Sequence, residues 1–365
     1  MNICIIVGAR PNFIKVAPIL KAIDRAREAG QQIESQLVFA GCEDDPTMET
    51  SLFDDLQMRK PDAYLHADAE NLNELTGQVM AAFERHLHEH PADTVIVVDD
   101  LASTLAAAIV TKKQGIRLAH LVAGTRSFDI SMPKEINRLV IDGLSDLLFT
   151  AGVGSNSAVT REGAEQSKVY TVGNILMDTL RMNHSRLHRP NLCDSLGLTE
   201  RGYLLFTLNR RAIIADRDNL KAMLEALLQH AAGVPIVAPL RQNAAAAVAE
   251  VLSELGPTAS CLHLVSPQPY LDFGWLSAHA LGIVTDSGNV AEEATFNGVP
   301  CITLNSYTEH IETVKVGTNE LVGEDATRLA EATRKMVAGE WKHGSLPEQW
   351  DGRTAERIVQ ILLNN

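Results

Sequence analysis

The chain alternates short apolar runs with longer stretches of helical pattern, and this alternation constrains its fold more than any other feature. The runs are rich in β-branched residues and lack polar alternation, which is typical of strands covered on both faces. In the first half they occupy residues 2–7, 36–39, 94–98, 118–122 and 146–150. Helical patterns at residues 73–87 and 103–112 lie between them. Alternating strands and helices predict a parallel sheet with right-handed crossover connections.

The same alternation restarts in the second half of the chain. Further apolar runs occupy residues 203–207, 235–238, 262–265, 282–285 and 300–304, and residues 181–199 show little periodicity, as a linker would. A chain of 365 residues suits two domains, because a single core rarely grows beyond about 250–300 residues. We therefore predict an α/β protein of two doubly wound, Rossmann-like domains with a cleft between them. In such sheets, ligands bind where loops converge at the C-terminal ends of the strands.

These patterns also suggest domain bounds. We place the N-terminal domain at residues 1–182 and the C-terminal domain at residues 183–345. Residues 346–365 are predicted to end in a helix, since apolar residues recur there at helical spacing: Ala355, Ile358, Val359 and Leu362.

Composition excludes several classes of partner. The net charge of -14 and the pI of about 5.3 argue against binding to nucleic acid or to an anionic membrane surface, because both need a basic surface. No apolar run approaches the ~20 residues that span a bilayer. The five cysteines are scattered without the spacing of a metal site or a disulfide framework, so we expect neither. The N-terminus resembles a strand rather than a signal peptide, which favours a cytoplasmic location.

The first predicted strand ends in Gly8-Ala9-Arg10-Pro11, and Lys15 follows about one turn into a helix. Glycine permits a tight turn, and proline suits the first helical turn. The N-terminus of a helix carries partial positive charge and free N–H groups, so it attracts phosphate, and Arg10 and Lys15 add cations there. The alternative is that Arg10 pairs with an acidic residue and Lys15 is solvated.

A second junction of this kind is the segment 285–294, TDSGNVAEEA. Asp286 or Ser287 can cap the helix, and Gly288 lets a ligand approach the backbone. One of the carboxylates of Glu292 and Glu293 could accept hydrogen bonds from ribose hydroxyls. The alternative is an ordinary capped helix whose acidic residues complement its dipole.

Two more polar segments follow predicted strands. Asp99 and Asp100 come directly after the run TVIVV, and one of them may serve only as a helix cap. The segment 308–312, TEHIE, follows the last predicted strand through a polar loop. Its carboxylates and His310 either handle sugar hydroxyls or decorate a surface loop.

Four collinear segments resemble motifs of the non-hydrolysing UDP-N-acetylglucosamine 2-epimerase family, and the match runs over nearly the whole chain. The segments are GARPNFIKVAP, HLVAGTRSFDISMPKEINR, TDSGNVAEEA and TEHIETVKVGT. The resemblance implies a GT-B-like architecture of two Rossmann-like domains, with UDP in the cleft, a nucleotide-binding C-terminal domain and a C-terminal helix crossing back. It also implies a homodimer and no cofactor beyond the UDP or UDP-sugar ligand.

By the same resemblance, Arg10, Ser287 and Glu293 match positions that hold the nucleotide, and Lys15 lies in the first catalytic motif. We expect the nucleotide to be bound by the following residues: Arg10, Arg241, Phe273, Ser287, Gly288, Asn289 and Glu293. We expect the following catalytic set, with no metal ligand: Lys15, Asp100, Lys134, Glu135 and His310.

The chain departs from the family pattern at positions that carry chemistry. Val122 and Lys134 stand where the family motifs have glutamates, and Asn209 stands where they have histidine. Family members remove the C2 proton of the sugar and expel UDP, so ionisable groups are needed on both faces of the ring. Valine transfers no protons, and asparagine does not replace histidine as a base near pH 7. Conventional epimerisation is therefore doubtful, although the nucleotide-binding positions persist.

Three hypotheses follow. The first is an epimerase with rearranged acid–base groups. The second is a GT-B glycosyltransferase that uses a UDP-sugar donor, with Asp100 or Glu135 as base and Lys134 or Arg241 balancing the diphosphate charge. The third is a non-catalytic sensor of nucleotide sugars.

Overall fold

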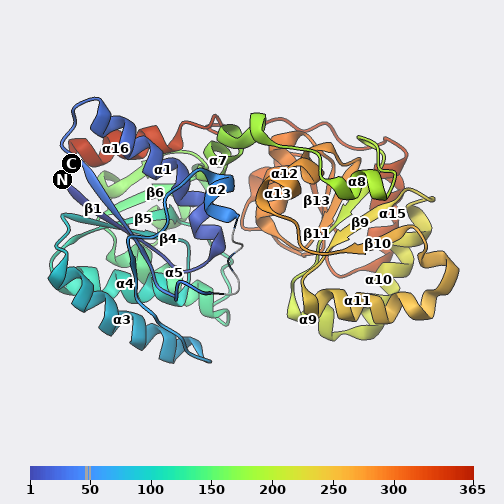
Figure 1. Ribbon diagram of the computed structural model, residues 1–365, viewed down its shortest axis with the longest axis horizontal. Coiled ribbons are helices and arrows are strands. Elements are labelled where there is room, and N and C mark those ends of the chain that lie inside the picture. Colours follow the sequence, from blue (N-terminus) through green and yellow to red (C-terminus); the bar gives the residue numbers. More distant parts are fainter. Residues whose placement is uncertain (46–47, 49–50) are drawn as a thin grey trace. The chain divides into compact units, whose positions relative to one another are not determined.

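A computed structural model describes residues 1–45, 48 and 51–365, and the chain divides into two units (Figure 1). Unit 1 contains Met1–Ser185 and Glu348–Asn365, and unit 2 contains Arg186–Pro347. The segment predicted as a linker surrounds the first boundary between them but is not wholly irregular, because a short helix, α8 (Asn191–Ser195), forms within it.

Unit 1 is built on a seven-stranded parallel sheet in the order β3-β2-β1-β4-β5-β6-β7. Its strands are β1 (Asn2–Val7), β2 (Glu34–Phe39), β3 (Ala63–Tyr64), β4 (Thr94–Val98), β5 (Arg117–Ala123), β6 (Leu147–Thr150) and β7 (Val169–Thr171). Every residue of β4 is buried, as its unbroken apolar sequence predicts. The strand order reverses between β1 and β4, which is where doubly wound sheets bind ligands.

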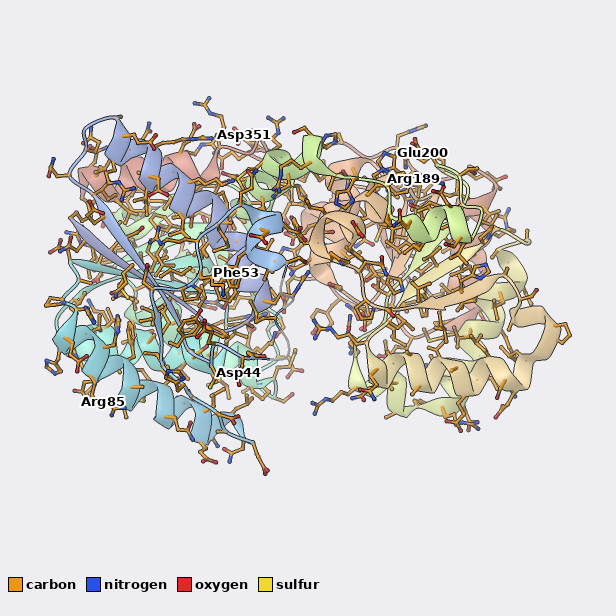
Figure 2. The ribbon with its side chains drawn as sticks, viewed as in Figure 1. Asp44, Phe53, Arg85, Arg189, Glu200 and Asp351 are labelled. Carbon is orange, nitrogen blue, oxygen red and sulfur yellow. The ribbon has the colours of Figure 1, made fainter. Side chains whose placement is uncertain are left out.

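Helices cover both faces of this sheet (Figure 1). One face carries α1 (Arg10–Glu28), α7 (Ile175–Asn183) and α16 (Thr354–Asn364), and the other carries α3 (Leu72–Glu89), α4 (Ala102–Lys113) and α5 (Pro133–Leu144). The remaining helical elements are α2 (Leu52–Leu56), α6 (Val153–Arg161), η1 (Gln166–Lys168) and η2 (His184–Arg186). Arg85, for example, lies exposed on the outer surface of α3 (Figure 2).

Unit 2 repeats the same plan with a six-stranded parallel sheet in the order β10-β9-β8-β11-β12-β13. Its strands are β8 (Leu204–Phe206), β9 (Ile236–Pro239), β10 (Leu262–Val265), β11 (Gly282–Thr285), β12 (Cys301–Thr303) and β13 (Asn319–Leu321). Its helices besides α8 are α9 (Arg211–Ala215), α10 (Arg217–His230), α11 (Gln242–Leu255), η3 (Gly256–Ala259), α12 (Tyr270–His279), α13 (Gly288–Asn297), α14 (Ile311–Lys315) and α15 (Ala326–Val337). Here the strand order reverses between β8 and β11.

The prediction of two doubly wound α/β sheets is confirmed, and the cleft stays a prediction. Three strands were missed: β3, β7 and β13. Each lies at an edge of its sheet and has only two or three residues. An edge strand is covered less completely than a central one, so it needs no continuous apolar run and leaves little signal in the sequence.

The C-terminal helix α16 packs in unit 1 against α1 and α7. Its apolar residues are buried as their spacing predicts: Ala355, Ile358, Val359 and Leu362. The buried carboxylate of Asp178, on α7, accepts hydrogen bonds from the backbone N–H groups of Thr354 and Ala355 at 3.1 and 2.8 Å. These are N–H groups of the first helical turn, which have no partner within the helix. Asp178 therefore caps α16 from 176 residues away.

No helix among the described residues is long and apolar enough to cross a membrane. All five cysteines are free thiols, and burial raises the pKa of Cys4 and of Cys301 to about 12. These two thiols are therefore protonated at neutral pH. The cytoplasmic location stays a prediction.

We expect Asp178→Ala to lower the free energy of unfolding by about 1–3 kcal/mol, because two buried N–H groups lose their acceptor. Asp325→Ala is the matched control, since Asp325 caps α15 through two N–H groups at an exposed position, and its loss should cost about 1 kcal/mol. Urea unfolding of both variants measures the difference. A loss in Asp178→Ala that does not exceed the control would show that the distant cap contributes nothing beyond an ordinary one.

Candidate functional site

In unit 1, the loop after β1 is tied to the loop after β4 by a chain of polar contacts. The Gly8 amide donates to the Asn12 side chain at 2.9 Å, and Asn12 donates to the Asp99 carboxylate at 2.8 Å. The ammonium group of Lys15 is buried and lies 2.5 Å from the other oxygen of Asp99. A Cβ atom at Gly8 would collide with Ser103 Oγ, so only glycine lets α4 approach this closely. The alternative that Lys15 is solvated is wrong.

The N-terminus of α1 begins at Arg10, and proline occupies its first turn as predicted. Arg10 is half-buried, and no acidic residue stands in that turn. The helix itself therefore offers nothing to compensate its partial positive charge. Anion binding at this junction stays a prediction.

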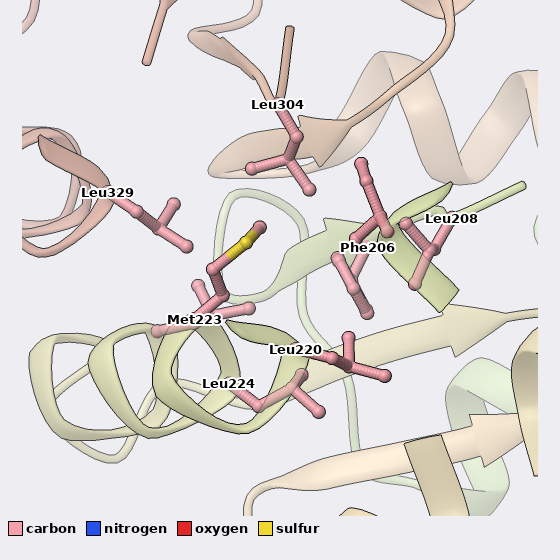
Figure 3. Close-up of a pocket in the computed structure, with 9 residues that line it drawn as sticks. Phe206, Leu208, Leu220, Met223, Leu224, Leu304 and Leu329 are labelled. Carbon is pink, nitrogen blue, oxygen red and sulfur yellow. The ribbon is translucent and has the colours of Figure 1, made fainter. Parts of the chain in front are cut away.

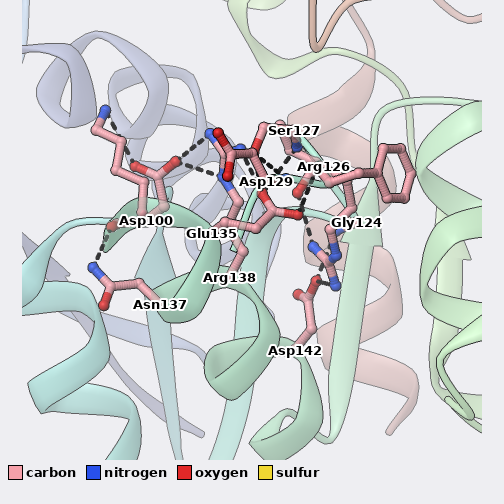
Figure 4. Close-up of polar contacts among 12 residues, drawn as sticks. Asp100, Gly124, Arg126, Ser127, Asp129, Glu135, Asn137, Arg138 and Asp142 are labelled. Atoms are coloured by element: carbon pink, nitrogen blue, oxygen red, sulfur yellow. Dashed lines mark hydrogen bonds and ion pairs between the residues drawn. The ribbon is translucent and has the colours of Figure 1, made fainter. Parts of the chain in front are cut away.

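Asp100 lies next to Asp99 but faces a different set of cations (Figure 4). Its carboxylate lies 2.6 Å from the Arg138 guanidinium and 3.5 Å from the Lys134 ammonium group. Asn137 also donates to the Asp100 carbonyl at 2.8 Å. Burial alone would raise the pKa of Asp100, but Lys134, Arg138 and Lys15 outweigh it, so the pKa is lowered. Asp100 is therefore a paired carboxylate and not a helix cap, since Leu101 precedes the first turn of α4.

Glu135 fixes the loop that follows β5 (Figure 4). Its buried carboxylate accepts from the backbone N–H groups of Ser127 and Phe128, from the Ser127 hydroxyl and from Arg138, all at 2.9–3.1 Å. Burial would raise the pKa of Glu135, but these donors outweigh it and the pKa is lowered. A carboxylate held in this way is ionised and occupied, which suits a structural anchor better than a mobile base.

Val122 occupies a strained position in β5. The pairing of β5 with β6 shifts register between Leu121 and Ala123, and Val122 has φ of 71°. A β-branched residue in the left-handed region is an outlier that costs on the order of 1–3 kcal/mol. Val122 therefore holds a demanding backbone geometry at this bulge.

In unit 2, Asp286 joins the two loops at the reversal of strand order. One oxygen accepts from the backbone N–H groups of Asn209 and Arg210 at 2.7 and 2.6 Å, and Asn305 donates to the Asp286 carbonyl at 3.1 Å. The other oxygen is buried with no hydrogen-bond partner among the described residues. Burial raises the pKa of Asp286. Asn209 thus contributes its backbone to this junction, while its side chain is exposed.

Ser287, and not Asp286, caps α13, through a 3.5 Å contact from the Val290 N–H to the Ser287 hydroxyl. His310 lies over the first turn of this helix: a Cβ atom at Gly288 would be 3.4 Å from the imidazole ring. The ring is held by Glu292, whose carboxylate lies 3.1 Å from Nδ1 and is itself buried. The segments 285–294 and 308–312 therefore meet at the N-terminus of α13.

The other predicted binding residues lie in unit 2 at different depths. Asn289 is half-buried in the first turn of α13, and Glu293 is buried one turn further along. Arg241 is exposed in the position preceding α11, just after β9. Phe273 on α12 is half-buried and packs against the hydrophobic core that contains Trp275. Its side chain therefore has a packing role irrespective of any ligand.

Two other features of the described residues do not form a ligand site. A cavity of about 10 Å³ in unit 2 is lined by apolar side chains such as Phe206, Met223 and Leu304, and has room for about one water-sized sphere (Figure 3). Within the same part of the chain, no group of three or more His, Cys, Asp or Glu side chains could hold a metal ion.

Three buried residues of unit 1 were not singled out from the sequence as site residues: His120, Arg126 and Asp142. Asp142 lies 2.6 Å from His120 Nδ1 and 2.7 Å from the Arg126 guanidinium. The sequence does contain a signal for Asp142. Glu135, Arg138 and Asp142 stand at i, i+3 and i+7, so a helix places all three on one face.

Comparisons with known proteins give one family. A family model described as UDP-N-acetylglucosamine 2-epimerase matches residues 25–363. A UDP-N-acetylglucosamine 2-epimerase homolog of Methanococcus maripaludis is 33% identical over 100% of both chains. The UDP-2,3-diacetamido-2,3-dideoxy-D-glucuronate 2-epimerase of Pseudomonas aeruginosa is also 33% identical, over 99% of both chains.

A solved structure of the Methanocaldococcus jannaschii UDP-GlcNAc 2-epimerase, in complex with UDP-GlcNAc and UDP, is 31% identical. It covers 100% of both chains with a TM-score of 0.86. The likeness spans both units, and the predicted GT-B-like fold class is confirmed.

We expect Arg138→Met to destabilise unit 1 by about 3–5 kcal/mol, because Asp100 and Glu135 would stay buried without their shared cation. Lys134→Met is the matched control: the Lys134 side chain is 58% exposed, so its loss should cost no more than about 1 kcal/mol. Urea unfolding at pH 7 measures both variants. Equal losses of unfolding free energy in the two variants would show that Asp100 and Glu135 do not depend on Arg138.

The difference in unfolding free energy between the wild type and Arg138→Met should depend on pH in a defined direction. Because the pKa of Asp100 is lowered in the folded state, its contribution is present above the unfolded value of about 3.9 and is lost as the pH falls through the folded value. Arg138→Met removes one of the cations that lower the pKa of Asp100. The gap in stability between the wild type and the variant should therefore hold between pH 7 and about 4 and narrow as the pH falls below about 4.

Proposed function

The chain belongs to the UDP-N-acetylglucosamine 2-epimerase family, and from that premise we propose that it binds a UDP-sugar while the family's usual acid–base chemistry is impaired. The proposal has two parts. The first concerns the nucleotide, and the second concerns proton transfer at C2 of the sugar.

Binding of the nucleotide is supported by the N-terminus of α13. Free N–H groups of the first helical turn attract phosphate, and Gly288 leaves the backbone open to a ligand. His310 lies beside that turn, and Glu293 one turn further on is suited to accept hydrogen bonds from ribose hydroxyls. In unit 1, Arg10 supplies a forked cation at the N-terminus of α1.

Impaired proton transfer is supported by one observation above all: the Asp100 carboxylate is already paired with Arg138 and Lys134. Removing a proton from carbon requires a base whose lone pair can reach it, and an ionised carboxylate with a lowered pKa between two cations is a weak base. Glu135 is occupied by the loop after β5. Val122 offers no ionisable group.

Each missing acid or base typically costs about 10²–10⁴ in rate, although losses within one catalytic unit do not add. The cations at Asp100 suit a different task. Lys134 and Arg138 can balance negative charge near the carboxylate without moving a proton. The chain is thus better suited to holding a nucleotide sugar than to epimerising it by the usual route.

We expect UDP and UDP-N-acetylglucosamine to bind by calorimetry, and we expect exchange of the C2 proton in D₂O to be at least about 10²-fold slower than for the Methanocaldococcus jannaschii epimerase under the same conditions. NMR of the C2–H signal and of free UDP measures epimerisation, transfer and hydrolysis together. Exchange as fast as in the control enzyme would contradict the second part of the proposal, and an absence of binding would contradict the first.

A triple variant supplies the positive control within the same chain. Val122→Glu, Lys134→Glu and Asn209→His restore the residue types of the family motifs. If the substituted groups limit the reaction, the triple variant should exchange the C2 proton faster than the wild type. The variant Lys21→Glu, on the outer surface of α1, controls for the added negative charge.

We also propose that two copies of the chain pair through α5. The inward face of this helix carries Glu135, Arg138 and Asp142, while Ile136, Leu139 and Val140 are 51%, 39% and 38% exposed on its outer face. A chain with a net charge of -14 repels its copies, yet this outer face contains no acidic side chain. An apolar helix stripe is self-complementary, as a twofold interface requires.

Light scattering after size exclusion should therefore give twice the chain mass of 39.7 kDa. Leu139→Glu with Val140→Glu should give the monomer, because the charges would be buried unpaired in the interface. The control is Thr160→Glu, at an exposed position on α6. A wild-type monomer, or a dimer that survives the double substitution, would refute pairing through this face.

A further inference from the structure

His120 is a buried side chain of unit 1 whose two ring nitrogens both face hydrogen-bond acceptors. Nδ1 lies 2.6 Å from the Asp142 carboxylate, and Nε2 lies 2.9 Å from the backbone carbonyl of Asp99. The ring is 2% exposed, so water does not take the place of either partner. A neutral imidazole has one N–H donor, and a protonated one has two. Both contacts are satisfied only when both nitrogens carry protons.

Asp142 is held in its ionised form by other groups. Its second oxygen lies 2.7 Å from the Arg126 guanidinium and accepts from the Gly124 N–H at 3.1 Å. Burial would raise the pKa of Asp142, but His120 and Arg126 outweigh it and the pKa is lowered. The proton in the contact between Asp142 and His120 therefore belongs to the histidine.

The surroundings of His120 contain few other charges. The neighbouring strands β4 and β6 have none (TVIVV and LLFT), and α4 carries its two lysines at its far end, where Lys112 pairs with Asp146. From α5 the facing group is Asp142, and from the loop after β5 it is Arg126, which also pairs with Glu162. From the loop after β4 it is Asp99, which is paired with Lys15. The excess of carboxylate around the ring favours the cation.

The contact with Asp99 connects this charge to the predicted ligand-facing loop. Asp99 has φ of 59°, in the left-handed region that few non-glycine residues occupy. Its carbonyl is fixed by His120, while its carboxylate holds Lys15 and Asn12, and Asn12 holds the Gly8 N–H. If His120 were neutral with its proton on Nδ1, which the Asp142 carboxylate favours, the lone pair on Nε2 would face the carbonyl oxygen and repel it.

We propose that His120 is a permanently charged positioning residue, whose two N–H groups lock the Asp99 backbone and thereby place Lys15 and the Gly8 loop. It touches no ligand itself. Its effect on UDP binding rests on the proposed function, but its charge and its hold on Lys15 do not.

The charge is measured on the wild type by ¹⁵N NMR of the histidine side chains between pH 5.5 and 8.5. His120 should show two protonated nitrogens over the whole range. His86 is the matched control, because it is a buried histidine of the same unit whose Nε2 contacts the neutral Gln36 side chain at 3.0 Å, and burial lowers its pKa. It should be neutral at pH 8.5. A neutral His120 at pH 7.5 overturns the proposal.

The positioning role is measured on Asp142→Asn, which removes the carboxylate that keeps the ring charged. In this variant the imidazole should lose a proton between pH 5.5 and 8.5, as histidines ordinarily do. The Lys15 ammonium signal, slowed in exchange by its contact with Asp99, should match the wild type at pH 5.5 and weaken at pH 8.5. The affinity for UDP relative to the wild type at the same pH should fall at least tenfold over the same interval.

A purely structural defect would reduce both readouts equally at every pH, and that result overturns the positioning role. If the wild type binds no UDP at any pH, the proposed function fails, and the Lys15 signal still decides the inference. If Asp142→Asn does not fold, Arg126→Met removes a cation that repels the charged ring, so His120 should keep both protons over the whole pH range. A His120 that loses a proton between pH 5.5 and 8.5 in a folded Arg126→Met variant counts against the account of the charge.

Discussion

The Arg138 guanidinium is the interaction on which the polar interior of unit 1 depends. It is shared between Asp100, which follows β4, and Glu135, which lies one turn earlier in its own helix. A buried charge that loses its partner costs several kcal/mol, so both carboxylates would be less stable there without this cation. Since Glu135 also holds the backbone after β5, one cation sets the positions of two neighbouring strand-end loops.

This interior makes α5 an unusual helix, because Glu135, Arg138 and Asp142 are buried on its inner face while Ile136, Leu139 and Val140 are exposed on its outer face. The inward charges are arranged in pairs of opposite sign, with Arg138 between two carboxylates and Asp142 between His120 and Arg126. Such networks are stable only when every member is satisfied. Each of these buried carboxylates therefore has a guanidinium partner.

Much of the fold could be predicted from the sequence, because central strands such as β1 and β4 are buried on both faces and read as unbroken apolar runs. The edge strands β3, β7 and β13 could not, since partial burial leaves their sequences mixed. The types of site residue were also accessible, but their partners were not. Asp99 meets Lys15 across 84 positions and Asp100 meets Arg138 across 38, and only the fold brings such groups together. Asn209 acts through its backbone, which no side-chain pattern reveals.

The cap that Asp178 places on α16 has a consequence for how the chain is made. Unit 1 is discontinuous: its first 185 residues are synthesised before unit 2, and residues 348–365 come last. Until then, the surface of α1 and α7 that receives α16 stays uncovered. The Asp178 carboxylate on that surface lacks the two N–H donors of Thr354 and Ala355. Unit 2, which is continuous in sequence, can complete its core earlier. Unit 1 therefore begins before unit 2 in the chain and is completed after it.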